Sequence, residues 1–209
     1  YEKEYPNRNL SDGACVTRFA PSPTGFMHIG HFMPALIDYV VAKQSGGVFY
    51  LRNEDTDKAR EVEGSMELII KILNYYGLTP DEYQVGDELI GNYGPYVQSE
   101  RKEIYHTFIK HLIEIGRAYP CFCSTEELSE MRENQEAMKT RTGYHGRFAR
   151  CSRLTPEEAI EKINNGEKFI IRFRSNGNFE NKFEFDDLRQ GKLFLNENDI
   201  DEVIMKAET

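Results

Sequence analysis

The sequence lacks the features of a membrane-embedded or secreted protein. No apolar run approaches the roughly 18 residues that a bilayer-spanning helix needs, and residues 1–8 are too charged for a signal peptide. An excess of positive charge is also missing, because 26 Lys and Arg stand against 35 Asp and Glu, for a formal net charge of −9. A protein of this charge does not hold nucleic acid by bulk electrostatics, so any RNA contact must be local. We expect a soluble, cytosolic protein without a membrane partner.

Cysteine is scarce, with four residues in 209, and no internal repeat or low-complexity tract is visible. In a reducing compartment such a set indicates metal ligation or free thiols, not disulfides. The length suffices for a substantial core, which indicates one domain with an insertion or two small domains. The chain starts at Tyr1 without a methionine and stops at Thr209 directly after a strand-like run, so we expect a fragment of a longer protein.

The most informative segment is RFAPSPTGFMHIGH at residues 18–31, a turn rich in proline and glycine that ends in two histidines. β-Favouring residues precede it and an apolar run follows, so we expect a turn between a strand at 15–19 and a helix at 34–43. Pro34 would occupy the first helical turn, where its missing N–H costs little.

A strand-to-helix junction of this kind suits phosphate binding, because free backbone N–H groups and the helix dipole favour negative charge. Gly25 and Gly30 let a ligand approach the backbone closely, and His28 and His31 can donate hydrogen bonds. The alternative for either histidine is a loop residue that is merely hydrogen-bonded to backbone.

The rest of the chain divides into a β-α-β unit and a mixed region. Gly46 and Gly47 end the first helix, and a strand follows at 48–52, which gives half of a Rossmann-like sheet. We expect helices at 62–76 and 99–115, an irregular segment at 79–97, helices that begin at the capping-box pairs Ser124/Glu127 and Thr155/Glu158, and strands at 169–173, 182–185 and 192–195. Ser99 is the expected cap of the 99–115 helix, whose buried face would hold Ile104, Phe108, Leu112 and Ile115.

Four ordered blocks resemble the bacterial-type glutamyl-tRNA synthetases, a class I group, and the resemblance covers nearly the whole chain. They are TRFAPSPTG at 17–25, HIGH at 28–31, LRNEDTD at 51–57 and GPYVQSER at 94–101. The resemblance implies an α/β fold: residues 1–98 as the first half of a Rossmann-like catalytic domain, and residues 99–209 as an inserted α+β connective domain that binds the tRNA acceptor stem. The second half of the Rossmann fold would lie beyond Thr209.

The implied activity is ATP-dependent attachment of glutamate to its tRNA through a glutamyl-adenylate, with Mg²⁺ as the companion of ATP. A monomer is the family-based expectation. The family's second signature, a KMSKS-type lysine loop, does not occur in these residues, so we expect the chain alone to be inactive in adenylation.

The resemblance also assigns binding residues. His28 and His31 would be catalytic by holding ATP phosphates, and the ATP-binding set comprises Pro23, Thr24, Gly25, His28, Gly30 and His31. Glutamate would be bound by Arg18, Ala20, Ser22 and Glu54, with the Arg18 fork suited to a carboxylate and Glu54 to an α-ammonium group. The alternatives are a strand-end salt bridge for Arg18 and a solvated turn carboxylate for Glu54.

The sequence departs from the family pattern at two places, and one further motif bears on the choice between glutamate and glutamine. Many glutamate enzymes carry glycine where this chain has His31, with an arginine shortly after it where this chain has Phe32, Met33 and Pro34. The PSPTG run at 21–25 replaces the PEPNG that is typical of glutaminyl enzymes, which favours glutamate. An enzyme that charges both glutamate and glutamine tRNAs remains open. The carboxylates at 54–57 lack the spacing of a calcium loop.

A cysteine set in the second half resembles the zinc site of some family members. Cys121 and Cys123 in CxC spacing would be joined by Cys151 and by His145 or Tyr144 as the fourth ligand of a closed structural site. The alternative is three thiols that pack as small apolar groups, as we expect for Cys15 in the first strand.

A basic cluster provides the local patch that contact with tRNA phosphates would need. It consists of Lys139, Arg141, Arg147, Arg150 and Arg153. A solvated face paired with nearby glutamates is the alternative. At the level of function, the alternatives are the paralogue that attaches glutamate to a modified anticodon base of aspartate tRNA, and a non-catalytic module that binds tRNA or an amino acid.

Overall fold

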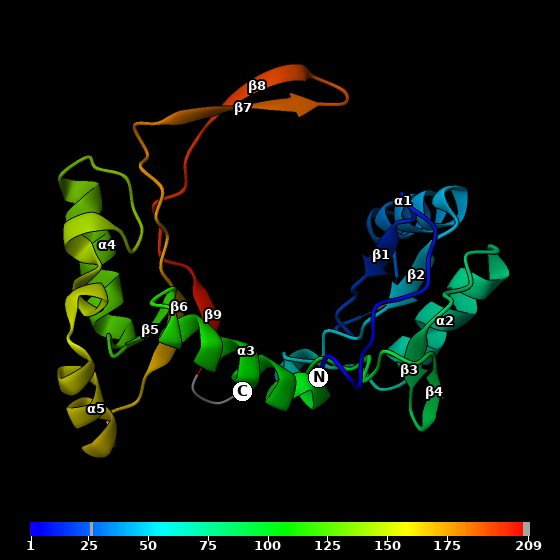
Figure 1. The fold of residues 1–209 in the computed structure, drawn as a ribbon, viewed down its shortest axis with the longest axis horizontal. Coiled ribbons are helices and arrows are strands. Elements are labelled where there is room, and N and C mark those ends of the chain that lie inside the picture. The colour runs from blue at the N-terminus through cyan, green and yellow to red at the C-terminus, as the bar shows by residue number, and fades with distance from the viewer. Residues whose placement is uncertain (26, 207–209) are drawn as a thin grey trace. The chain divides into compact units, whose positions relative to one another are not determined.

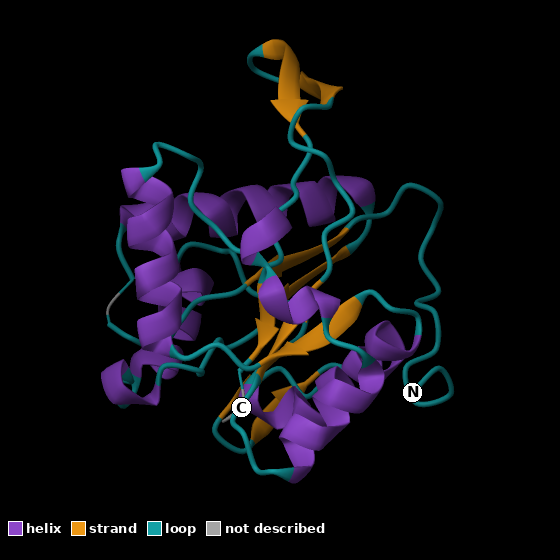
Figure 2. Cartoon of the chain, turned by 90° about the vertical axis from the view of Figure 1, so that its left-hand side faces the viewer, coloured by secondary structure: helices purple, strands orange, loops and turns teal. Residues whose placement is uncertain are grey.

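The structure is a computed structural model that describes residues 1–25 and 27–206. Residue 26 and residues 207–209, the end of the predicted inserted domain, lie outside the described residues. The chain forms two compact units, Tyr1–His106 and a second unit that begins at Thr107, so the division falls within helix α3 (Lys102–Glu114). Figure 1 labels the elements and Figure 2 distinguishes helices from strands. In the described part of the chain, no helix has both the length and the apolar character needed to cross a membrane.

The first unit contains the predicted β-α-β element. Strands β1 (Val16–Phe19) and β2 (Val48–Leu51) pair in parallel, and α1 (Ile29–Ser45) connects them and packs against both, as Figure 1 shows. Phe49, Leu51 and Ala42 are fully buried where helix and strands meet. Gly46 ends α1 with a left-handed backbone conformation, φ 70°, as the sequence predicts. The half Rossmann-like sheet is therefore confirmed.

Helix α1 begins at Ile29, five residues before the predicted start, so the expectation for Pro34 is wrong. Pro34 lies inside the helix, beyond its first turn. The reason is the cap: the His28 side chain accepts a hydrogen bond from the Gly30 N–H and replaces the serine or aspartate that usually marks a helix start. The two histidines thus belong to the helix N-terminus and not to a loop before it.

The segment 79–97 is more regular than predicted. It holds a short antiparallel hairpin of β3 (Tyr83–Val85) and β4 (Glu88–Ile90), which turns at Gly86 with φ 55°. Before it, α2 (Ser65–Tyr75) buries Met66, Ile69, Ile70 and Leu73 against the β-α-β core, as the helical spacing predicts. A 3-10 turn (Lys58–Arg60) precedes α2.

Two expectations for the next helix are wrong. Ser99 does not cap it, because residues 99–101 form a 3-10 turn and both Ser99 donors bind Asp55 instead. The exposed fractions of Phe108 and Ile115 are 59% and 55%, and the buried residue of α3 is Ile109. Tertiary contacts, which helical spacing does not reveal, decide which face is covered.

The second unit has a three-stranded antiparallel sheet in the order β5-β6-β9: Ala118–Cys121, Ile170–Phe173 and Val203–Met205. Helices α4 (Thr125–Ala137) and α5 (Pro156–Asn164) start at the predicted capping boxes, both of which form. Two short 3-10 helices, Gly146–Phe148 and Arg150–Arg153, lie between α4 and α5. The hairpin of β7 (Lys182–Asp187) and β8 (Gly191–Asn196) matches the predicted strands.

Strand β5 was not predicted. Pro120 in its four-residue run counts against a strand in the sequence pattern, because proline cannot donate to a sheet ladder. β5 tolerates it as an edge strand that pairs only with β6. This strand places Cys121 in the sheet.

We expect Gly47→Ala to destabilise the protein by at least about 3 kcal/mol, the upper range for overpacking. A Cβ at Gly47 would lie 1.8 Å from the Cys15 carbonyl oxygen, a main-chain atom that cannot rotate away. Gly46→Ala is the matched control: its Cβ has room, and it bears only the left-handed conformation, about 1–2 kcal/mol. Urea unfolding of both variants measures the difference, and equal losses would contradict the close approach.

Candidate functional site

The turn after β1 is held by three hydrogen bonds to its carbonyl oxygens. The Glu54 N–H donates to Pro21 O at 2.9 Å, the Val62 N–H to Pro23 O at 2.8 Å, and the Ser65 hydroxyl to Gly25 O at 2.9 Å. Pro21 and Pro23 are buried. The turn is therefore fixed by the chain that follows β2, and its shape is set before any ligand arrives.

His28 and His31 stack at the start of α1, with ring centroids 4.0 Å apart and planes tilted by 31°. Because His28 Nδ1 accepts the Gly30 N–H, a neutral His28 carries its hydrogen on Nε2, which is then a donor. A Cβ at Gly30 would lie 2.8 Å from the His28 ring, so glycine leaves the space that this ring position needs. The pair presents two exposed imidazoles at the positive end of a helix dipole.

A pocket of about 220 Å³ opens between the turn and the helix start. It is lined by Phe19, Pro21, Ser22, Thr24, Gly25, Met27, His28, His31 and Ile69. Four of the predicted ATP-binding residues, Thr24, Gly25, His28 and His31, line this one pocket, together with Ser22 from the predicted glutamate set. Pro23 and Gly30 support it from the turn and the helix backbone.

Glu54 is the centre of a charge cluster at the ends of β1 and β2. Arg52 donates to Glu54 Oε1 from Nε at 2.9 Å and from Nη2 at 2.6 Å, and Arg18 approaches the same oxygen at 3.4 Å. The Gln98 amide also lies against this carboxylate. Arg18 is 41% exposed and its contact is long, so its guanidinium is available to a further carboxylate. The structure brings the two predicted glutamate-binding charges together and adds Arg52, which sequence reasoning missed.

Asp55 lies next to this cluster, 3% exposed, and connects β2 to the start of α3. Its carboxylate accepts from the Ser99 N–H at 2.9 Å, the Ser99 hydroxyl at 2.5 Å and Lys58 Nζ at 2.7 Å. Burial raises the pKa of Asp55, but the hydrogen bonds from Lys58 and Ser99 outweigh it, and the pKa lies below its ordinary value of 3.8. Asp55 is thus a structural anion of the LRNEDTD block.

A partly buried ion pair supports the same unit from its N-terminus. Arg8 binds Glu82 through both guanidinium nitrogens at 2.5 and 2.6 Å, and the Tyr96 hydroxyl donates to Glu82 at 2.8 Å. The Arg8 guanidinium lies 3.8 Å from the centroid of the Tyr93 ring. Nothing in the sequence around Arg8 indicates this pairing, because its partner lies 74 residues away.

The second unit brings its three cysteines together. The sulfur atoms of Cys121, Cys123 and Cys151 all lie within 4.8 Å of one another. The Tyr144 hydroxyl lies 3.3 Å from Cys123 Sγ and accepts the Cys151 N–H at 3.0 Å. Hydrogen bonding from the Cys151 thiol lowers the pKa of Cys121 below its ordinary value in spite of its burial. Cys15 is exposed, so its expected packing as a small apolar group is wrong.

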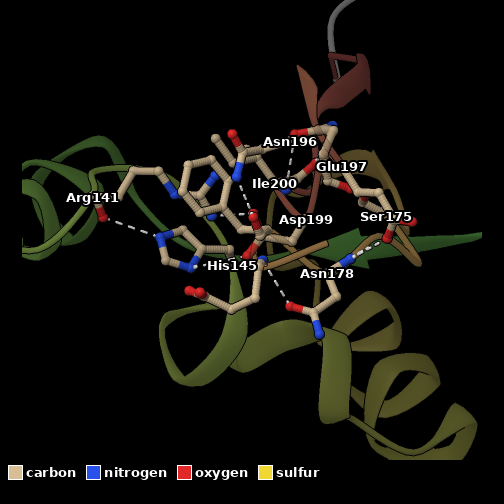
Figure 3. A network of polar contacts seen from close by, with 12 residues as sticks. Arg141, His145, Ser175, Asn178, Asn196, Glu197, Asp199 and Ile200 are labelled. Atoms are coloured by element: carbon tan, nitrogen blue, oxygen red, sulfur yellow. Dashed lines mark hydrogen bonds and ion pairs between the residues drawn. The ribbon is translucent and has the colours of Figure 1, made fainter. Parts of the chain in front are cut away.

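The two candidate fourth ligands are placed differently. Tyr144 is 3% exposed and touches the sulfur cluster. His145 turns away: its Nε2 contacts the Arg141 carbonyl oxygen at 3.1 Å, and its Nδ1 lies 3.9 Å from the Asp199 carboxylate (Figure 3). Neighbours in sequence point to opposite sides of an extended segment, and here the tyrosine faces the thiols.

The predicted basic cluster is divided by its local partners. Arg141 pairs with Asp199 and lies over the Phe179 ring at 3.7 Å, in the polar network of Figure 3. Arg150 pairs with Glu127. The contacts of the other three are weaker. Arg147 contacts the Met138 sulfur, Arg153 donates to the Arg147 carbonyl oxygen, and the Lys139 main-chain N–H donates to Glu136 O.

A half Rossmann-like unit with a paired-histidine helix start, followed by a separate α+β unit, defines a mixed α/β protein with a Rossmann-like core. Residues 14–209 match the family model of class I tRNA synthetases (E and Q), catalytic domain. The chain belongs to this family.

Named relatives agree with this assignment. The chain is 53% identical over 203 residues to the glutamate–tRNA ligase of Acetivibrio thermocellus and 51% identical over 209 residues to that of Clostridium beijerinckii. These matches include 97% and 100% of this chain. The chain spans only 37% and 38% of the length of the two relatives. A glutamate tRNA ligase structure from Elizabethkingia meningosepticum, in complex with its amino acid, matches with a TM-score of 0.79 at 36% identity, over 94% of this chain and 39% of that one.

We expect Asp55→Asn to lower the free energy of unfolding by about 1–3 kcal/mol at neutral pH, since a buried charged acceptor of two Ser99 donors is lost. Because the folded pKa of Asp55 lies below its ordinary 3.8, its stabilisation is present above that pH and is lost as the pH falls through the folded value. The variant should lose less stability on acidification. Denaturant unfolding between neutral pH and pH about 3 checks this, with exposed Asp87→Asn as the control; an unchanged acid dependence would contradict it.

Proposed function

We propose that the protein containing this chain activates glutamate with ATP and transfers it to tRNA. The observation that carries the proposal is the pocket in which His28, His31, Thr24 and Gly25 meet at the start of α1, with the Arg18–Glu54 pair at the neighbouring strand ends. The family and its relatives support the reaction class.

In the activation step, a glutamate α-carboxylate oxygen attacks the α-phosphorus of ATP, and pyrophosphate leaves. Imidazole N–H donors and the helix start offset charge on the phosphates, so catalysis consists of positioning and electrostatic stabilisation. Mg²⁺ accompanies ATP and is held mainly by phosphate oxygens and water. A terminal ribose hydroxyl of tRNA then attacks the adenylate carbonyl carbon, and AMP leaves.

Glutamate recognition rests on exchange of an existing charge pair. Arg18 and Glu54 meet at 3.4 Å, longer than a strong ion pair, while Arg52 holds the same Glu54 oxygen at 2.6 Å. A substrate carboxylate would form an ion pair with Arg18, and the α-ammonium group would form one with Glu54. Ser22 adds a hydroxyl and Ala20 leaves space beside them.

We also propose that residues 1–98 are the first catalytic half and residues 99–209 the acceptor-binding insertion; the division of the chain within α3 lies near this boundary. Among the basic residues, Arg141 and Arg150 form ion pairs with carboxylates, so Lys139, Arg147 and Arg153 are more available to phosphates. Contact with the acceptor stem would then be short-ranged and sensitive to salt.

The cysteine cluster fits a structural zinc ion. Thiolates bound to zinc at about 2.3 Å in a tetrahedron lie about 3.8 Å apart, and Cys123 and Cys151 are separated by 3.6 Å. Cys121, Cys123, Cys151 and Tyr144 would hold the ion, with Tyr144 in place of His145. Zinc would stiffen the insertion and take no part in aminoacyl transfer.

The test of the proposed activity is charging by the full-length protein with purified tRNAs for glutamate, glutamine and aspartate. We expect glutamate on its own tRNA, because the PSPTG turn and Arg18 fit an acidic side chain. Additional charging of glutamine tRNA would define an enzyme that accepts both tRNAs. Transfer to aspartate tRNA alone would assign the paralogue's reaction, and no transfer by a folded protein would contradict the proposal.

In the full-length protein, His28→Ala and His31→Ala should each lower kcat for glutamate-dependent ATP–pyrophosphate exchange by about 10²–10³-fold, the usual effect of removing one transition-state donor. tRNA is included in the assay. His111→Ala on α3, outside the pocket, is the matched control and should be silent. Exchange that survives both substitutions would show that the pocket does not hold the reacting phosphates.

A further inference from the structure

A buried arginine lies beside the cysteine cluster. Arg172 on β6 is 6% exposed and is paired with Tyr119 of β5. Side chains alternate along a strand, so Arg172 shares a sheet face with Tyr119 and with Cys121, two residues further along β5. Its guanidinium carbon lies 4.0 Å from the centroid of the Tyr144 ring. Arg172 therefore borders two of the four groups in the cluster.

Among residues 1–25 and 27–206, no carboxylate forms an ion pair with Arg172. Its Nη1 donates to the main-chain oxygen of Asp201 at 2.8 Å, and its buried Nε has no hydrogen-bond partner among the described residues. The Asp201 carboxylate is engaged by the Tyr119 hydroxyl at 2.5 Å and the Ser175 N–H at 2.7 Å. A guanidinium stays protonated in proteins, and a buried charge is costly without an anion nearby. Besides the Asp201 carboxylate, the neighbouring groups that can carry negative charge are the thiols and the phenol of the cluster.

A second arginine reaches the cluster from a different element. Arg150 of the 3-10 helix Arg150–Arg153 donates from Nε to Cys123 Sγ at 3.3 Å, and its other end pairs with Glu127 of α4. Glu127 faces one end of Arg150, but three neutral thiols and a neutral phenol would give neither arginine a negative charge on the side of the cluster. Three thiolates around a divalent cation leave one net negative charge, and a tyrosinate as fourth ligand leaves two.

We propose that Arg172 and Arg150 compensate the charge of a metal–thiolate centre formed by Cys121, Cys123, Cys151 and Tyr144, and that they set its affinity for Zn²⁺. This inference rests on the proposed zinc site and deepens it. The two arginines are positioning residues: they contact the ligands, not the ion, and hold them in the anionic form that binds metal.

The test measures zinc affinity of the full-length protein by competition with a chromophoric chelator. Arg172→Met should weaken zinc binding by about 10–100-fold and Arg150→Gln by about tenfold, the range for residues that contact metal ligands. Arg172→Lys, which retains the charge, should recover part of the loss. The matched controls are Arg174→Met, an arginine directly after the end of β6 whose guanidinium lies over Tyr119, and Arg153→Gln in the same 3-10 helix as Arg150; neither should change the affinity.

A spectroscopic measurement separates charge compensation from a loss of fold. Co²⁺ bound by thiolates gives sulfur-to-metal charge-transfer absorption. The Co²⁺ concentration at which this absorption is half-maximal should be unchanged in the controls and higher in Arg172→Met. If Arg172→Met does not fold, Arg150→Gln carries the test, because that side chain is 54% exposed. If Arg150→Gln leaves zinc affinity unchanged, and a folded Arg172→Met does too, charge compensation by the arginines is overturned. The proposed zinc site itself would still stand. No zinc binding by the unsubstituted protein would overturn the zinc site and the inference with it.

Discussion

The first unit depends on the hydrogen bonds that hold the turn after β1. Three carbonyl oxygens, of Pro21, Pro23 and Gly25, accept donors from the chain after β2 and from the start of α2. Proline-rich turns offer few N–H groups, so their carbonyls need donors from elsewhere. This clamp fixes where the turn ends and hence where α1 begins. The stacked histidines and the pocket follow from that one constraint.

A different chemistry organises the second unit. Its cysteine cluster lies within a small apolar core that includes Tyr119, Tyr144 and Ala149, and this core is separate from the one around Ile109, Ala118 and Ile171. The cluster brings together β5, the segment after α4 and the second 3-10 helix, which are distant in sequence. A core this small benefits from a cross-link, and the proposed zinc ion would supply one.

Local signals predicted much of the fold. The β-α-β order, the glycine end of α1, both capping boxes and the strands of the β7–β8 hairpin depend on residues close in sequence, and all of them form. The failures involve distant partners. Ser99 looks like a cap in sequence, but Asp55, 44 residues away, takes its donors. No strand was expected around Pro120, because proline cannot donate to a sheet ladder. The strand forms there because it lies at the sheet edge and pairs with β6.

The features of the candidate site also divide into those that local sequence predicts and those that depend on distant partners. The sequence by itself determined that two histidines, a Pro- and Gly-rich turn and an acidic block exist and resemble one family, because residue type and spacing are enough for that. Only the tertiary structure decided that His28 caps α1, that Arg52 holds Glu54, that Tyr144 and not His145 faces the thiols, and that Arg172 is buried beside them. Each of these depends on which side chains the packed backbone brings within bonding distance, and spacing along a chain does not contain that distance.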